Sequence, residues 1–565
     1  MYLIKKIAAY FQNRHRGMLL ALLLAVTLVY IPYINNPLFF DDLPFFSDTV
    51  NRFVSGPWHL YSRWLPYMSL AWTVTAFSDA PLPLHLGNML LHFANTVLVF
   101  VLLQHLCSLT LNKNTQAANQ PIPSTAFFTS THFFTAPSNW GAWLGALAFA
   151  CHPVAVYAVG YVVERSIVMA TLFVLAMQIS YIKGLLSPQK LQQTIWLAFC
   201  ILFYGCAVFS KEHSLMAPAL LAAITLLIKP YINVNWRIFT ATWLGLIAVA
   251  ILIALRSRGI ATTAEHDATA LFTQHGIVST TENVHLLSIV TQVGLFFKYL
   301  FLWLVPNPAW MSIDMREPFA STLGLWQNWL KVGCFMAYGA IALKLLLKRG
   351  KAGLLGFALL YPWLLFFIEF SSVRVQEPFV LYRSYLWAPG LLFLIPLGLD
   401  SLPKRKAVTI AFAVVILAMI PLSWNRLNVF SDEYILWNDA ALLLKNDTQP
   451  GAARIFYNRG LADLHQQKLK AAVLDFKRVL AIDPMIYQAH ENLGSAYLGT
   501  GQFKEALASL NQAIAIKPDD SQAYFAKAFA LKRLNEKAGA TEALTKSCAL
   551  KNVSACLILK MSGKK

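Results

Sequence analysis

Residues 406–427 read KAVTIAFAVVILAMIPLSWNRL, and they mark the point where the chain changes character. Before Leu427, apolar runs long enough to cross a bilayer alternate with short polar segments, whereas the sequence after it is polar and repetitive. Hydrophobic residues make up 57% of the 565 residues and charged residues only 13%, which is more apolar surface than a soluble protein of this size can bury. We therefore predict an all-α protein with a polytopic membrane domain in residues 1–425 and a soluble domain in residues 426–565.

The apolar runs before Leu427 set the predicted topology. A further apolar segment, 286–305, lies in a long predicted outer loop, 256–325, and is interpreted as an outer-surface or re-entrant helix. Counting it as a span would place the basic clusters 348–351 and 404–406 outside, against the preference of Lys and Arg for the inner side. Eleven other runs have about the 17 to 25 residues that a spanning helix needs: 17–34, 84–107, 139–157, 165–185, 193–210, 213–230, 236–255, 326–347, 352–370, 384–400 and 406–424.

This layout predicts a multi-pass integral membrane protein, of the inner membrane in a bacterium, with a cytoplasmic N-terminus. The soluble domain then lies in the periplasm, or in the endoplasmic reticulum lumen of a eukaryote. Of the 14 acidic residues before Leu427, 13 fall on the outer side, so carboxylate chemistry is expected there. Lys and Arg of the inner loops explain the net charge of +19, and we expect membrane lipid rather than nucleic acid as a partner.

The soluble domain has a period of 34 residues. Pro484 and Pro518 are one period apart, and Gly460 matches Gly494 at the same spacing. This resembles the tetratricopeptide repeat, a pair of helices in each 34 residues, and predicts repeats at about 453–486, 487–520 and 521–554. Such arrays bind peptides or partner proteins, although many only pack against a neighbouring domain.

The seven cysteines follow no spacing typical of a metal site. Cys548 and Cys556 lie in the soluble domain and could form a disulfide in an oxidising compartment.

The first predicted outer loop, 35–83, begins with a pair of adjacent carboxylates, Asp41 and Asp42. Two neighbouring carboxylates near lipid repel each other and lose solvation, so a cation, a divalent metal or a substrate group should offset them. One of them could act as a general base that takes a proton from an attacking hydroxyl. The alternative is an ordinary loop pair at the start of a short helix.

Other polar residues gather at the outer ends of the predicted spans. Arginine suits a phosphate because it offers two parallel donors, and lysine supplies a point charge. The alternatives are snorkelling to lipid headgroups and structural ion pairs. No phosphate-binding or dinucleotide-binding glycine motif is present, nor His and Cys residues at zinc spacing. The cluster comprises Arg63, His152, Glu164, Arg165, Lys211, Glu212, His213, Arg374, Glu377 and Arg383.

Several passages together resemble one family, the transmembrane-and-tetratricopeptide O-mannosyltransferases and their bacterial relatives. They follow one another in the same order, with the repeats after them. Family members often carry acidic or amide residues where Tyr157 and Ile167 stand here, so the resemblance does not identify the sugar. The passages are Ser62-Arg63-Trp-Leu-Pro66, Leu84-His85-Leu-Gly-Asn88-Met-Leu-Leu-His92, His152-Pro153 through Glu164-Arg165, Ser210-Lys211-Glu212, Arg383-Ser-Tyr385-Leu-Trp-Ala-Pro389, and Trp424-Asn-Arg426 through Trp437.

The resemblance implies a GT-C glycosyltransferase, which takes a sugar from a polyprenyl-phosphate carrier on the outer face. The catalytic acidic residue of that fold, in the first outer loop, maps onto Asp41 or Asp42. By position, Arg165, Lys211 and Arg383 would hold the donor phosphate, and from its residue type Arg63 would join them. Asp314, in the loop after segment 286–305, would help to cover the donor.

We therefore predict transfer of a sugar to a hydroxyl of an exported protein, which the repeat domain would present. The donor is a polyprenyl-phosphate-linked sugar, and no other cofactor is required, although the carboxylate pair could hold a metal. The transfer is inverting or retaining, with a single inverting displacement favoured. One alternative enzyme modifies a glycolipid or cell-wall polymer. A non-catalytic alternative is a membrane-anchored scaffold whose repeats gather partners.

Overall fold

The computed structural model describes residues 14–46, 50–55, 63–111, 138–232, 234–256, 283–374, 377–402, 405–447, 449 and 451–561. All regular secondary structure in these residues is helical, which confirms the predicted all-α class. The chain forms two compact units. The first contains residues up to Met311 together with Phe319–Ser431, and the second contains Ser312–Pro318 together with the residues from Asp432 onward.

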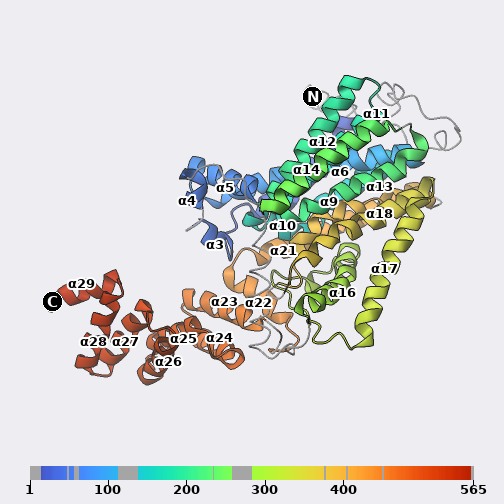
Figure 1. Cartoon of the computed structure of the whole chain (residues 1–565). Coiled ribbons are helices and arrows are strands. Elements are labelled where there is room, and N and C mark those ends of the chain that lie inside the picture. Colours follow the sequence, from blue (N-terminus) through green and yellow to red (C-terminus); the bar gives the residue numbers. More distant parts are fainter. Residues whose placement is uncertain are drawn as a thin grey trace, which may run out of the picture. The chain divides into compact units, whose positions relative to one another are not determined.

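Long apolar helices build the first unit, and several run side by side in Figure 1, as α11, α12 and α14 do. Their bounds are α2 (Arg14–Tyr30), α6 (Pro81–Leu111), α9 (Ser138–Cys151), α11 (Arg165–Leu186), α12 (Lys190–Ser210), α13 (Pro218–Ile228), α14 (Trp236–Arg256), α16 (Val284–Leu304), α17 (Trp326–Leu346), α18 (Gly350–Phe366), α20 (Leu394–Ser401) and α21 (Arg405–Val429).

Shorter helices and 3-10 turns connect the long helices of the first unit. Several have a proline as their first or second residue, because its fixed φ and missing N–H suit the first turn of a helix. The short α-helices are α3 (Asp42–Pro44), α4 (Val50–Ser55), α5 (Trp64–Phe77), α10 (Val156–Val159) and α19 (Ala388–Leu391). The 3-10 turns are η1 (Ile31–Tyr33), η4 (Pro153–Ala155), η5 (Val162–Glu164), η6 (Glu212–Met216), η7 (Lys229–Tyr231), η8 (Pro308–Trp310), η9 (Phe367–Ser371) and η10 (Leu381–Leu386).

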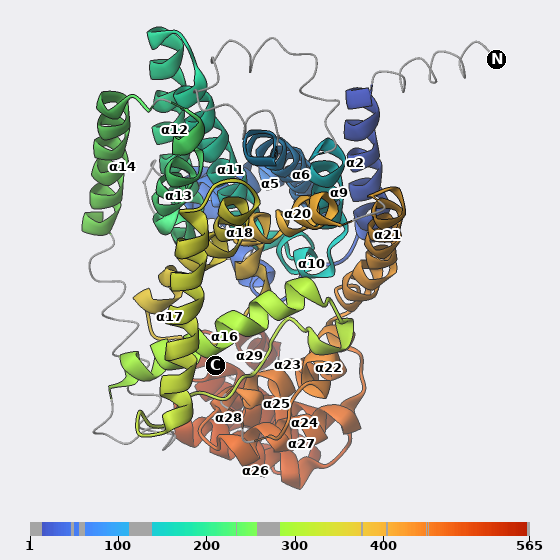
Figure 2. The same ribbon diagram turned by 90° about the vertical axis from the view of Figure 1, so that its right-hand side faces the viewer.

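Nine helices of the described residues are long and apolar enough to cross a membrane. Trp140–Cys151 and Pro153–Val159 add a pair bent by 47°, and Gly17–Tyr33 and Ala388–Ser401 are shorter apolar helices. Each of the eleven predicted spans coincides with one of these elements. The one long apolar helix among these elements that does not coincide with a predicted span is α16, which we predicted to lie at the outer surface. Length and composition alone do not separate α16 from a span, but Figure 2 shows it running obliquely past α17, which is upright in that view.

The second unit contains the repeats, drawn in orange and red in Figure 1. After α22 (Glu433–Leu442), three helix pairs coincide with the three predicted copies, and a final helix follows them. Cys548 and Cys556 are joined by a disulfide, which links the third pair to this final helix. The bounds are α23 (Ala452–His465), α24 (Leu469–Ile482), α25 (Tyr487–Gly499), α26 (Phe503–Ile516), α27 (Ser521–Arg533), α28 (Lys537–Ala549) and α29 (Val553–Met561).

Gly494 allows the two helices of the second repeat to approach closely. A Cβ atom at this position would lie 2.6 Å from Cγ of Leu510, which is fully buried on α26. We expect Gly494→Val to destabilise the repeat unit by about 1–3 kcal/mol, because the added methyl groups must push the helices apart. Thermal unfolding and limited proteolysis of the full chain in detergent measure this loss. Ala508→Val on the exposed face of α26 is the matched control and should have little effect.

Candidate functional site

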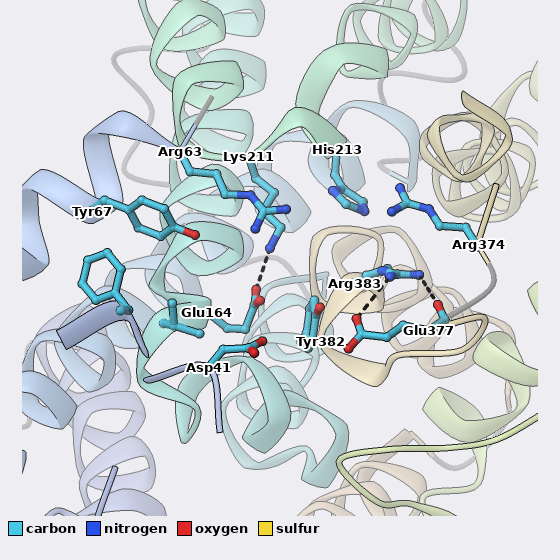
Figure 3. A pocket seen from close by; sticks show the side chains of 12 residues that line it. Asp41, Arg63, Tyr67, Glu164, Lys211, His213, Arg374, Glu377, Tyr382 and Arg383 are labelled. Atoms are coloured by element: carbon cyan, nitrogen blue, oxygen red, sulfur yellow. Dashed lines mark hydrogen bonds and ion pairs between the residues drawn. The ribbon is translucent and has the colours of Figure 1, made fainter. Parts of the chain in front are cut away.

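A cavity of about 370 Å³ opens in the first unit, where the connections between helices meet (Figure 3). Its lining residues come from the segment around α3, from the start of α5, from turns η5 and η6, and from the segment that leads into η10. Most of them are polar or charged. They are Asp41, Phe45, Arg63, Tyr67, Val163, Glu164, Lys211, His213, Arg374, Glu377, Tyr382 and Arg383.

The two adjacent carboxylates have different surroundings. Asp41 is exposed and lines the cavity, and its backbone N–H donates to the hydroxyl of Tyr161 at 3.0 Å. Asp42 is buried, and its Oδ1 accepts a hydrogen bond of 2.7 Å from the backbone N–H of Val163. The preceding Phe40 has a φ of 53°, a left-handed conformation that reverses the chain just before the pair. Asp41 is therefore the exposed carboxylate at the cavity, and Asp42 fixes the loop against η5.

Burial raises the pKa of Asp42 from 3.8 to about 7, although the backbone N–H groups of Val163 and Phe39 oppose the shift. The unfolded chain releases this proton at lower pH than the folded chain does. Between about pH 4 and pH 7 the folded state therefore holds more protons, and its stability falls as the pH rises.

The Asp42→Asn variant lacks this titration. We therefore expect its melting temperature, relative to that of the wild type, to rise between pH 5 and pH 8. Thermal unfolding in detergent at several pH values measures the difference. Asp79→Asn, at an exposed carboxylate, is the control and should show no such trend. A constant difference between Asp42→Asn and the wild type across this range would contradict a raised pKa.

A buried ion pair forms the wall between η5 and η6. Nζ of Lys211 lies 2.8 Å from Oε2 of Glu164 and donates to Oγ of Ser166 at 3.0 Å. Lys211 is fully buried, and its ammonium group also lies over the ring of Tyr382. Burial lowers the pKa of Lys211, and the carboxylate of Glu164 counteracts this. The pair places one cation and one anion at the centre of the cavity wall.

A second ion pair joins the first loop to η6 at the cavity edge. Arg63 contacts Glu212 through two hydrogen bonds, Nη2 to Oε1 at 2.7 Å and Nε to Oε2 at 3.3 Å. Both side chains are about a third exposed, at 37%. The Glu212 carboxylate raises the pKa of Arg63, so the guanidinium remains charged. Arg63 itself has a left-handed φ of 65° just before α5, which turns the chain toward this contact.

The opposite side of the cavity carries two arginines that share one buried carboxylate. Nη1 of Arg383 and Nε of Arg374 each lie 3.3 Å from Oε2 of Glu369. His213 approaches the other oxygen of Glu369 at 3.0 Å. Glu377 accepts from Arg383 through its backbone carbonyl at 3.1 Å, and its carboxylate lies 3.8 Å from Nη2. The two guanidinium groups thus share one buried carboxylate, Glu369, and the carboxylate of Glu377 lies beside them at the cavity.

Figure 3 shows Asp41 and Glu164 on one side of the cavity and Arg374 and Arg383 on the other. Charges of both signs therefore lie on each side: Lys211 accompanies Glu164 on the Asp41 side, and Glu377 accompanies the two arginines on the other. An anion fits the arginine side, because guanidinium groups bind phosphate oxygens through parallel N–H donors. A hydroxyl group that must lose a proton fits the Asp41 side.

Arg165 was predicted to hold the donor phosphate, but it does not line the cavity. Its Nε donates to Oδ1 of Asn88 at 2.8 Å, and Nη2 donates to the carbonyl of Leu84 at 2.7 Å. Nη1 lies within 3.4 Å of the hydroxyls of Ser69 and Thr73. These contacts connect α11 to α5 and α6.

Two residues of the family-like passages that are also candidates for the site, His152 and Tyr385, are buried and do not line the cavity. His152 stacks on Trp303 with ring centroids 4.2 Å apart, and its Nε2 lies 3.0 Å from the Trp303 carbonyl. The Tyr385 hydroxyl lies 2.7 Å from Nδ1 of His92 and accepts from the side-chain amide of Asn95. Both side chains connect helices within the first unit.

Asp314 was predicted to help cover the donor, but it belongs to the second unit. Its Oδ2 accepts from Nη2 of Arg316 at 2.6 Å and from Nε of Arg454 at 2.8 Å. These contacts anchor the segment Ser312–Pro318 to the first helix of the repeats.

The sequence pattern missed five residues of the site, one of which is the lining residue Val163. Tyr67, Tyr382 and Phe45 line the cavity, and Glu369 lies behind its arginines. Aromatic residues are common throughout this chain, so they carried no signal. Glu369 is an acidic residue within an apolar run, and this could have marked it, because a charge at such a position needs a partner.

The sequence also allows a metal ion at the carboxylate pair Asp41 and Asp42. Within the part of the chain that the structure describes, no group of three or more His, Cys, Asp and Glu residues could hold a metal ion. Asp42 directs its oxygens to backbone N–H groups of Val163 and Phe39 instead.

Comparisons with known proteins identify the repeats. The TPR repeat family matches residues 499–535. A BBSome complex member BBS4 homolog of Drosophila melanogaster is 25% identical over 104 residues, 18% of this chain and 21% of that protein. Serine/threonine-protein phosphatase T of Trypanosoma brucei brucei is 35% identical over 69 residues, 12% of this chain and 15% of that protein. The chain thus spans about a fifth or less of the curated relatives it matches.

Two solved structures give the same comparison in three dimensions. MamA is 21% identical, with a TM-score of 0.20, over 26% of this chain and 84% of that one. The Cut9–Hcn1 hetero-tetramer of APC/C is 12% identical, with a TM-score of 0.22, over 95% of this chain and 98% of that one. TM-scores this low assign no architecture to the chain. The family match confirms the predicted tetratricopeptide repeats in the C-terminal part.

Proposed function

We propose that this protein is a membrane glycosyltransferase that moves a sugar from a polyprenyl-phosphate carrier to a hydroxyl group of an exported protein. One observation carries the proposal: Asp41 lines the same cavity as Arg374 and Arg383. A base and a phosphate-binding pair in one cavity are the two groups that such a transfer needs. Because no part of a scaffold requires this arrangement, it favours an enzyme over a non-catalytic anchor.

The chemistry would be a single displacement. The acceptor hydroxyl oxygen attacks the anomeric carbon, and the bond from that carbon to the phosphate oxygen breaks. Asp41 takes the hydroxyl proton, and the bond electrons leave with the lipid phosphate. Arg374 and Arg383 stabilise the negative charge that grows on this phosphate, with Lys211 in the adjoining wall. The sugar would be inverted at its anomeric carbon, because nucleophile and leaving group lie on opposite faces.

The remaining ion pairs would position these groups. Glu369 holds both arginines, and the Arg63–Glu212 pair fixes the cavity edge where the first loop meets η6. A fixed array of charges stabilises a transition state better than mobile side chains, because it does not reorganise during the reaction. Arg165, through its contacts to α5 and α6, would act only by supporting the helix that follows Glu164.

The proposal places the cavity on the outer side of the membrane. The apolar helices of the first unit are candidate spans, and the oblique α16 is what a helix at the membrane surface would show (Figure 2). The disulfide between Cys548 and Cys556 favours an oxidising compartment for the repeats, such as the periplasm. The repeat unit would then meet exported acceptor proteins on the same side as the cavity.

Mass analysis of exported proteins and of lipids tests the proposal. In cells that lack this chain, an exported protein should lose the mass of one or more sugars and regain it when the chain is restored. A loss confined to glycolipids or wall polymers would point to the alternative enzyme. If proteins, lipids and polymers were all unchanged, and the repeats alone rescued any growth defect, the result would favour the non-catalytic scaffold.

A further inference from the structure

The last repeat carries a groove of about 1170 Å³ between α27 and α28. Apolar or small residues, Leu531, Gly539 and Ala543 among them, form part of its lining. Lys527, Lys537 and Lys546 also line it, with Glu542 as the one acidic side chain among its lining residues. The groove therefore combines an apolar surface with an excess of positive charge.

In the second repeat, the equivalent face is covered by the third repeat. Leu493 is buried and packs in one cluster with Ala530 of α27. Phe503 lies under the guanidinium of Arg533, which is 4.8 Å from its ring. This face therefore serves for stacking one repeat on the next.

The corresponding face of the third repeat carries different residue types. One period of 34 residues separates its lysines from their counterparts in the second repeat. Lys527, Lys537 and Lys546 stand at the positions of Leu493, Phe503 and Gln512, respectively. Three uncharged side chains have thus become cationic. The final helix α29 packs on α28, but none of its residues lines the groove, so the lysines are not covered by this helix.

Charge is concentrated in the same part of the chain. Residues 521–565 contain nine Lys and Arg against two Asp and Glu, whereas residues 453–520 contain eight against seven. The difference is confined to the last repeat and the residues after it. Such a patch attracts acidic partners and speeds their association.

We infer that the groove between α27 and α28 binds an acidic polypeptide segment, with carboxylates on the three lysines and small apolar side chains on the groove floor. A polypeptide fits better than a lipid surface, because Lys527 is half-buried inside a concave groove that a flat bilayer does not enter. A second copy of this chain fits poorly, because its equivalent face carries the same positive charge. The proposed transfer reaction is not needed for this binding.

Fluorescence anisotropy of the full chain in detergent, with a short labelled peptide in which Glu alternates with Ala, tests the inference. The groove variant Lys527→Glu/Lys537→Glu/Lys546→Glu should bind the peptide at least about tenfold more weakly, since three charge contacts are reversed. A matched control, Lys470→Glu/Lys504→Glu/Lys532→Glu, changes the net charge equally at exposed positions of the repeats and should keep its affinity. The same peptide with Gln in place of Glu should not bind.

Equal weakening in both triple variants would overturn the inference, because it would show general attraction to a basic protein. The inference would also be overturned if vesicles that contain phosphatidylglycerol bound to the wild type but not to the groove variant, while the peptide bound to neither protein. Self-association of the wild type that the groove variant abolishes would assign the groove to a second copy instead. Because binding is measured without sugar transfer, a negative result here leaves the proposed enzyme activity standing, and a failure of that activity leaves this test intact.

Discussion

Replacing Asp41 by Asn should lower the rate of sugar transfer by about 10²–10⁴-fold, because a general base of ordinary efficiency contributes that much. The substitution keeps the size and shape of the side chain but removes the carboxylate that would take the proton. The exposed position of Asp41 predicts an unchanged fold. The measurement is the mass shift of an acceptor protein over time, with membranes that contain equal amounts of each variant.

Asp79→Asn is the matched control, because it changes another exposed carboxylate in the same stretch of sequence without touching the cavity. It should transfer at the wild-type rate. Full activity of Asp41→Asn would remove the proposed base. Full activity of Asp41→Asn with complete loss in a normally folded Asp42→Asn would reassign that role to the buried neighbour.

Replacing Glu369 by Ala should destabilise the first unit by about 3–5 kcal/mol, because it leaves two buried or half-buried guanidinium groups without their shared partner. The carboxylate itself is fully buried and also contacts His213, so three groups lose their neighbour in one step. Thermal unfolding in detergent measures the loss. Glu369→Gln should recover part of the stability, since its amide oxygen still accepts a hydrogen bond.

Asp400→Ala is the control for this prediction. Asp400 pairs with Lys351 at 3.0 Å, but the two side chains are 22% and 46% exposed, so water replaces the lost contact. An exposed pair contributes about 0–1 kcal/mol. Equal destabilisation by Asp400→Ala and Glu369→Ala would show that the cluster of Glu369, Arg374 and Arg383 contributes no more to stability than an exposed ion pair does.

The structure brings some of the predicted site residues to one cavity and not others, and two adjacent residues show why. Glu164 and Arg165 are neighbours, yet Glu164 lines the cavity while Arg165 points into the contact between α5 and α6. Turn η5 ends at Glu164 and α11 begins at Arg165, so the chain changes direction between them. A pattern that places both at the outer end of a span does not distinguish the two directions.

Asp41 and Asp42 separate in the same way. The partners that fix them, Tyr161 and Val163, lie about 120 residues further along the chain. No local signal states which of two equal carboxylates will find a backbone N–H at that distance. Only the packed loop decides that Asp42 is buried and Asp41 remains accessible.

The sequence by itself determined the helices and the repeats. Apolar runs of spanning length and a 34-residue period are local patterns, and local patterns are enough to specify where a helix lies and how helix pairs recur. The tertiary structure alone decided which charged groups share a cavity, because the direction of a side chain depends on the turn that carries it and on distant partners. Arg383 therefore lines the same cavity as Asp41. Arg165 is equally basic and is also predicted at the outer end of a span, but its side chain connects helices instead.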